Sequence, residues 1–179
     1  MKQAAVTIAL AFTLTACGSD PEFTPAPAAP EPGLSMPSNA QGPFAVTRVV
    51  DGDTVRVLID GQDTPVRLIG IDTPETVAPN RPVECAGPEA SVYAEQLMAG
   101  TSVYLEVDPT QGTYDTYNRV LAYVWLAGEN ENVMVNLAML QAGLAEEYTY
   151  DDAYRYQQPF REAEQQARDD LLGQWGQIC

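Results

Sequence analysis

The pattern of apolar and polar residues predicts three strands in succession near the start of the folded part of the chain. Aliphatic and β-branched side chains, which favour strands, recur in Val46–Val50, Thr54–Ile59 and Thr64–Ile71. The stretches are joined at residues 51–53 and 60–63 by Asp/Gly sequences typical of hairpin turns. We therefore expect a three-strand meander. Its last strand is expected to end near Asp72, because Pro74 cannot donate to a ladder.

The rest of the chain alternates between helical and strand patterns. We expect two further strands at Ser102–Val107 and Val120–Leu126, and helices from Gly87 to Gly100, from a cap at Asn132 to Gly143, and from near Pro159. Five strands that begin with a tight meander favour an α+β protein with a β-barrel core. The expected fold is a five-stranded OB-fold barrel decorated by about three helices. A generic α+β sandwich would give a similar string of elements.

The first 17 residues have the character of a targeting segment. Lys2 supplies a positive start, residues 4–14 are apolar, and Leu14-Thr15-Ala16-Cys17 closes the segment. This apolar stretch is shorter than a transmembrane helix needs. Its ending resembles a bacterial lipoprotein box, in which Cys17 becomes the lipidated first residue; a plain secretory peptide is the alternative. We therefore expect an extracytoplasmic protein, lipid-anchored to a bacterial membrane, or secreted if Cys17 is not lipidated.

Residues 18–43 contain seven prolines among alanine, serine and glycine and almost no large apolar side chains. Such a composition cannot bury a core and favours a semi-extended tether. From residue 44 to residue 179 the apolar content and spacing are those of one compact domain.

The numbers of cysteine and histidine residues limit the kinds of bond and catalytic site that the protein can form. If Cys17 carries lipid, Cys85 and Cys179 remain as a pair in an oxidising compartment, and we expect them to form a disulfide. A redox or metal pair is the weaker alternative, because the chain has no CxxC motif and no histidine. The lack of histidine also excludes histidine-metal nucleases, zinc proteases and Ser-His-Asp hydrolases.

The charge of the chain is strongly acidic. Nine basic residues face 25 acidic ones, and beyond residue 17 the basic residues are all arginine. Such a net charge repels phosphate polymers at long range. Three explanations stay open at this point. The partner is not a polyanion, or a local cationic site with a divalent metal overcomes the repulsion by the acidic protein, or the protein works in high salt, which screens that repulsion.

Charged residues able to perform chemistry gather in three segments, Val50–Val55, Arg67–Thr76 and Asp115–Tyr123. In the second, Asp72 and Glu75 flank a proline turn and Arg67 precedes them. Two carboxylates and a guanidinium at a strand end could hold a divalent cation and a phosphate. A solvated turn after an ordinary strand is the local alternative.

These three segments, in this order, resemble the staphylococcal nuclease (thermonuclease) family, and the first two are also close to the family pattern in spacing. The resemblance covers about residues 46–175. The third segment keeps Asp115, Tyr117 and Arg119 of the family's Asp-x-Tyr-x-Arg element. It departs at Thr116, where model members carry lysine, and at Asn118, where they carry glycine. The resemblance implies an OB-fold barrel and a Ca²⁺-dependent phosphodiesterase acting on DNA and RNA.

The resemblance also implies a metal site. Asp53 and Asp72 would supply carboxylate ligands to Ca²⁺, and the main-chain carbonyl of Thr73 a third. Asp51 would support these ligands without binding the ion. A hard cation that takes several oxygens suits this set.

The same comparison implies the catalytic groups. Glu75 would orient and deprotonate the attacking water. Arg67 and Arg119 would clamp the phosphate and offset the charge that grows on its oxygens. Attack with departure of the 5′ oxygen would leave 3′-phosphate ends.

Three tyrosines are candidates for contact with the substrate. Tyr117 matches the family's phosphate-contacting tyrosine, and Tyr148 or Tyr150 resembles the one beside the base pocket, with Tyr148 preferred. Tyrosines in this number also serve as core edges.

Two functions follow as expectations. The first is a membrane-tethered nuclease with a DNA or RNA substrate and no obligate protein partner. The alternative is a catalytically weak, nuclease-like barrel that binds a protein or peptide through its acidic surface, which the charge favours.

Overall fold

The computed structural model describes residues 34–76, 82–150, 152–176 and 178–179. The expected targeting segment with Cys17, and the tether up to residue 33, lie outside the described residues. The folded domain begins slightly earlier than the sequence predicts. Its first strand starts at Gln41, and Leu34 and Met36 pack against the core.

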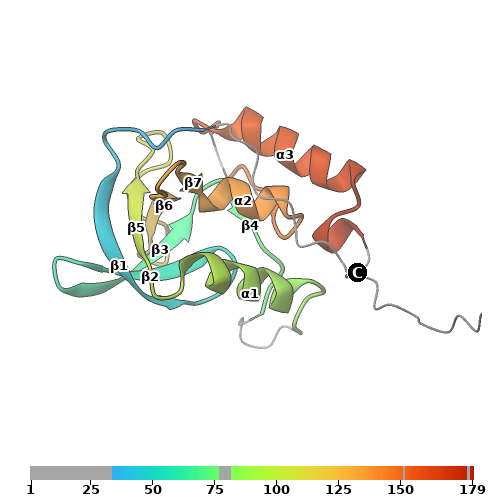
Figure 1. Cartoon of the computed structure of the whole chain (residues 1–179), viewed down its shortest axis with the longest axis horizontal. Helices are drawn as coiled ribbons and strands as arrows, with labels where there is room; N and C mark the ends of the chain where they lie inside the picture. The colour runs from blue at the N-terminus through green and yellow to red at the C-terminus, as the bar shows by residue number, and fades with distance from the viewer. Residues whose placement is uncertain (1–33, 77–81, 151, 177) are drawn as a thin grey trace, which may run out of the picture.

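Five strands form a closed barrel, as the sequence predicts (Figure 1). They are β1 (Gln41–Val49), β2 (Thr54–Ile59), β3 (Gln62–Leu68), β5 (Ser102–Glu106) and β6 (Val120–Leu126). The order is β3-β2-β1-β5-β6, and a parallel pairing of β3 with β6 closes the barrel. In the β2–β3 ladder, Thr54 lies opposite Arg67. This register brings the start of β2 and the end of β3 to one end of the barrel.

The prediction of one continuous strand from Thr64 to Ile71 is wrong. Strand β3 ends at Leu68, and a separate short strand β4 (Ile71–Asp72) pairs with β8 (Glu146–Glu147). Gly70 has φ of 78°, and a Cβ on it would lie 2.6 Å from the Tyr154 ring. Because the chain turns at this glycine, Arg67 and Asp72 lie on different strands and face each other across the turn.

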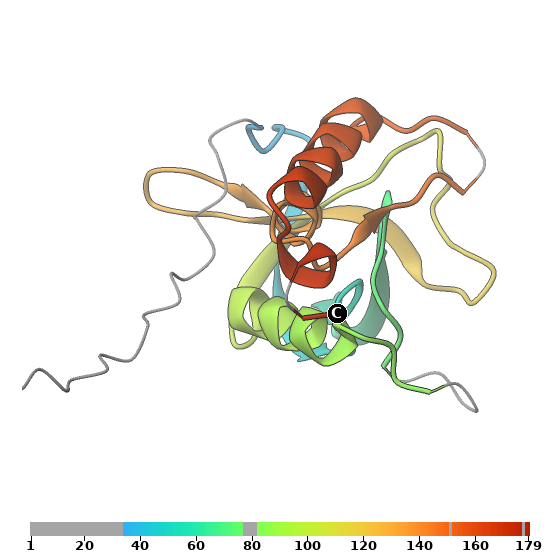
Figure 2. The same cartoon turned by 90° about the vertical axis from the view of Figure 1, so that its right-hand side faces the viewer.

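Three helices cover the barrel, in agreement with the sequence. They are α1 (Gly87–Met98), α2 (Val135–Gln141) and α3 (Gln157–Asp169), and a 3₁₀ turn η1 (Gly173–Trp175) follows. Helix α2 lies between α1 and α3 (Figures 1 and 2) and contacts both helices as well as β6. No helix in the described ranges is long and apolar enough to cross a bilayer.

The predicted cap at Asn132 is wrong. Residues Val133–Met134 form strand β7, which pairs with Trp125 and Leu126 of β6, so the helix begins only at Val135. The residue before that helix is Met134, and no side chain caps it. Pairing with the end of β6 therefore decides where α2 begins. The last helix begins at Gln157, two residues before the expected proline.

A buried amide connects the barrel to the turn that carries the candidate site. Asn136 of α2 is fully buried. Its side chain donates to the carbonyl oxygen of Ile69 at 2.9 Å and accepts from the amide of Val124 at 2.9 Å. Because both partners are buried main-chain groups, this side chain fixes the β3–β4 turn against β6.

The expected disulfide is present. Cys85 is joined to Cys179, 94 residues away, with the two Cα atoms 5.8 Å apart. The bond fastens the residues before α1 to the end of the chain.

Candidate active site

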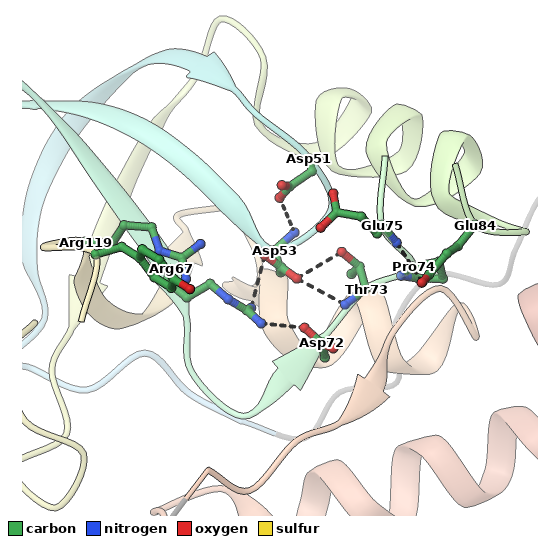
Figure 3. A pocket seen from close by; sticks show the side chains of 10 residues that line it. Asp51, Asp53, Arg67, Asp72, Thr73, Pro74, Glu75, Glu84 and Arg119 are labelled. Carbon is green, nitrogen blue, oxygen red and sulfur yellow. Dashed lines mark hydrogen bonds and ion pairs between the residues drawn. The ribbon is translucent and has the colours of Figure 1, made fainter. Parts of the chain in front are cut away.

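A cavity of about 550 Å³ opens at the end of the barrel where β2 begins and β3 ends. Its lining is almost entirely charged or polar: Asp51, Asp53, Arg67, Asp72, Thr73, Pro74, Glu75, Glu84, Tyr117 and Arg119. These residues come from the β1–β2 turn, β3, β4 and the segment after it, the residues before α1, and the turn before β6 (Figure 3). The three charged segments of the sequence therefore meet at one place.

Asp53 lies at the centre of this arrangement. Its side chain is largely buried, and its Oδ2 accepts hydrogen bonds from the amide and the hydroxyl of Thr73, at 3.1 and 3.0 Å. Its Oδ1 accepts from the hydroxyl of Thr54 at 2.9 Å. A Cβ on Gly52 would lie 2.7 Å from the Thr73 side chain, so the glycine permits this close approach.

Arg67 joins the two carboxylates predicted to bind metal. Its guanidinium lies 3.1 Å from Asp53 Oδ1 and 2.7 Å from Asp72 Oδ1. It also donates to the carbonyl oxygen of Ile71 at 2.8 Å. Its side chain is only 13% exposed. These contacts hold the guanidinium in one orientation at the base of the cavity.

Arg119 reaches the same cavity from the turn before β6. Its Nε donates to Asp115 at 2.6 Å, and one terminal nitrogen donates to the Thr54 hydroxyl at 3.2 Å. Thr54 thus connects Arg119 to Asp53. Burial acts to raise the pKa of Asp115, but hydrogen bonds from the amide and guanidinium of Arg119 outweigh it and hold the pKa below its ordinary value. The ionised carboxylate is therefore a firm support for the arginine.

Glu75 follows the proline turn after β4, and its carboxylate points toward the side of the cavity that holds Asp51 (Figure 3). Its Oε1 accepts from the amide of Thr76 at 2.9 Å. Its own amide donates to Glu84 Oε2 at 3.0 Å. These two hydrogen bonds, one to each side of the Glu75 backbone–side-chain junction, therefore fix the direction in which this side chain leaves the backbone.

The carboxylates outnumber the cations around them. Burial, and then the charge of Asp53, raises the pKa of Asp51 to about 6. Burial also raises the pKa of Asp72, although Arg67 acts in the opposite direction. Within the part of the chain that the structure describes, no three acidic, histidine or cysteine side chains form a ready metal cage. The donors are nevertheless hard oxygens with surplus negative charge, which fits a divalent cation such as Ca²⁺.

A metal held by both Asp53 and Asp72 would have to compete with Arg67 for their oxygens. The guanidinium now takes the position of a cation between the two carboxylates. Thr73 contacts Asp53 through its amide and hydroxyl, whereas the sequence comparison implies a role for its carbonyl.

The two predicted substrate tyrosines differ in position. Tyr117 lines the cavity, is 80% exposed, and has its ring centroid 5.5 Å from the guanidinium carbon of Arg119. Tyr148 does not line the cavity. Its ring lies 6.3 Å from that of Tyr150, and both rings are exposed. Its amide donates to the carbonyl oxygen of Gly70, which places it beside the β3–β4 turn.

Two residues of the site, Thr54 and Glu84, have no role predicted from the sequence. Thr54 stands directly after Asp53 in the first charged segment, and its threonine hydroxyl was a signal that could have been used. Glu84 comes from a stretch of proline-bearing loop with no motif of its own. Only the fold brings it to Glu75, nine residues earlier.

Comparison with known proteins is consistent with this geometry. Residues 65–177 match the family described as "Staphylococcal nuclease homologue". The chain is 42% identical over 125 residues to a protein named thermonuclease from Staphylococcus hyicus, covering 70% of each chain. It is 37% identical over 129 residues to endonuclease YncB of Bacillus subtilis (strain 168), covering 72% of this chain and 59% of that one. It is 32% identical over 151 residues to a micrococcal nuclease of Shigella flexneri, covering 79% and 78%.

Proposed function

Because the chain belongs to the staphylococcal nuclease family and is therefore a nuclease, we propose that it is a Ca²⁺-dependent phosphodiesterase that cleaves DNA or RNA to 3′-phosphate products. We further propose that Cys17 tethers it to a membrane outside the cytoplasm. The support for the tether is the lipobox-like ending of residues 1–17 and the proline-rich stretch after it.

The acidic residues of the cavity would hold the metal. Asp53 and Asp72 would supply carboxylate oxygens and Thr73 its carbonyl, while Asp51 would support them from the β1–β2 turn. When bound, Ca²⁺ would supply positive charge that lowers the cost of the negative charge developing on the phosphate.

The two arginines would bind the phosphate. Arg67 and Arg119 approach the cavity from β3 and from the turn before β6, and each is braced by carboxylates. A guanidinium presents two N–H groups to two phosphate oxygens, which a lysine cannot do. The two side chains would thereby stabilise the charge that accumulates on the equatorial oxygens.

Glu75 would activate the water. Its carboxylate accepts the proton as the water oxygen attacks phosphorus, and the bond from phosphorus to the 5′ oxygen breaks. The 5′ oxygen leaves as a hydroxyl after taking a proton from solvent. The phosphate stays on the 3′ side.

The observation that carries this proposal is the convergence of two arginines on a cavity that also holds Glu75, Asp53 and Asp72. The chain has few basic residues, nine against 25 acidic ones, so placing two of them at one acidic cavity needs a reason. A phosphate that must be both attracted and activated supplies that reason.

A second candidate function rests on the charge. A net charge of −16 favours a cationic protein or peptide as the partner of the acidic surface. In that case the barrel would bind its partner and cleave nucleic acid weakly or not at all.

The test is hydrolysis of single-stranded DNA and RNA by the purified protein, with Ca²⁺ and with a chelator. We expect cleavage with Ca²⁺, no cleavage with chelator, recovery when Ca²⁺ is restored, and fragments that end in 3′-phosphate and 5′-hydroxyl. Cleavage that persists in chelator would contradict the metal dependence. A folded protein that cleaves neither polymer would favour the binding function.

A further inference from the structure

We propose that Glu84 is a positioning residue for Glu75. Its carboxylate holds the main-chain amide of Glu75 and so sets the direction in which the Glu75 side chain enters the cavity. The inference rests on the proposed function, because the direction of Glu75 matters for catalysis only if Glu75 acts on water.

The contact between the two residues is reciprocal. The amide of Glu75 donates to Glu84 Oε2 at 3.0 Å, and the amide of Glu84 donates to the carbonyl oxygen of Glu75 at 2.8 Å. Both main-chain polar groups of Glu75 are therefore bound to a single residue. Figure 3 shows Glu84 approaching the backbone of Glu75 from the side opposite to Asp53. Glu84 thus holds the backbone of Glu75 on one side, while the Glu75 side chain lines the cavity on the other.

Glu84 is itself well anchored. The amide of Gly87 donates to its carbonyl oxygen at 3.1 Å, which closes a turn immediately before α1. The next residue, Cys85, is joined to Cys179. A main-chain turn and a covalent bond therefore fix the support on which Glu75 depends.

The start of α1 also packs tightly against the chain around Glu75. A Cβ on Gly87 would lie 2.7 Å from the Thr76 side chain, 3.0 Å from the carbonyl oxygen of Pro74 and 3.1 Å from that of Glu75. Only glycine permits such an approach without displacement. This independent contact indicates that the segment from Pro74 to Thr76 is held by the residues at the beginning of the helix.

The positioning role requires a hydrogen-bond acceptor but no charge. Glutamine at residue 84 keeps an amide oxygen that can accept from the Glu75 amide, whereas alanine does not. A further negative charge at the cavity also opposes a phosphate substrate, so neither substitution should weaken substrate binding. Loss of positioning should therefore lower kcat without raising KM.

The experiment compares wild-type protein with Glu84→Ala and Glu84→Gln. We expect Glu84→Ala to lower kcat about tenfold with KM not raised, and Glu84→Gln to retain kcat within about twofold. Amide hydrogen exchange supplies a second measurement that does not depend on activity. Exchange at the Glu75 amide should be faster in Glu84→Ala and unchanged in Glu84→Gln. Because the Glu84 side chain is exposed, both variants should melt at the wild-type temperature.

Three results would overturn the inference: unchanged kcat and unchanged Glu75 exchange in Glu84→Ala, a rise in KM as the main effect, or no rescue by glutamine. An inactive wild-type protein would contradict the proposed function instead. In that case the exchange measurement would still decide whether Glu84 holds the Glu75 amide.

Discussion

Replacing Glu75 by glutamine is expected to lower kcat for single-stranded DNA by about 10²- to 10⁴-fold, the usual contribution of a general base. Glutamine has nearly the same shape and can still accept from the Thr76 amide, which the carboxylate does now at 2.9 Å. It cannot take a proton from water. The substitution therefore removes the chemistry and keeps the local structure.

The measurement is initial rate against substrate concentration with saturating Ca²⁺. The matched control is Glu89→Gln, since Glu89 lies in the first turn of α1, is exposed, and does not line the cavity. The control should have wild-type kcat. If Glu75→Gln retains more than about a tenth of wild-type kcat, Glu75 is not the general base.

Replacing Arg119 by alanine is expected to lower kcat by about 10³- to 10⁵-fold, the range found for an arginine that stabilises charge on a transferring phosphoryl group. The side chain is 27% exposed and its direct partners are Asp115 and Thr54. Its removal should therefore affect the phosphate more than the fold. Arg119→Lys should recover little activity, because a lysine cannot donate through two parallel N–H groups.

Arg56→Ala is the control for this effect. Arg56 pairs with Asp63 at 2.6 Å on the β2–β3 hairpin and does not line the cavity. The Arg56→Ala substitution removes one positive charge, as Arg119→Ala does, and should leave kcat unchanged. An equal loss of activity in both variants would mean that total charge, rather than a phosphate contact by Arg119, determines the rate.

The sequence predicted the barrel because local signals agree with the final fold. The conformations of the Asp/Gly turns, the aliphatic strands and the glycines that end helices are determined by residues close in sequence. Accordingly, β2, β6 and α1 have nearly the expected bounds. The errors occur where a contact between residues distant in sequence determines where an element begins or ends. Strand β3 ends early because Gly70 turns against Tyr154, and α2 starts late because Val133–Met134 pair with β6.

Five charged residues of the candidate cavity could be predicted from the sequence, but their arrangement could not. Motifs pointed to Asp53, Asp72, Glu75, Arg67 and Arg119, and all five line one cavity. No pattern in the sequence shows that Arg67 bridges the two aspartates, since this depends on the turn at Gly70. Nor does any pattern connect Glu84 to Glu75, because their contact requires the chain to return to the cavity at the start of α1.

The most direct test of the site is a crystal structure of the protein with Ca²⁺ and a non-hydrolysable dinucleotide. We predict one Ca²⁺ bound by Asp53, Asp72 and the carbonyl oxygen of Thr73, with Arg67 and Arg119 both on the phosphate and Glu75 facing the phosphorus. Arg67 would then have left at least one of the two aspartates that it now joins. Ca²⁺ bound elsewhere, or a phosphate outside the cavity with Arg67 still between Asp53 and Asp72, would contradict the account.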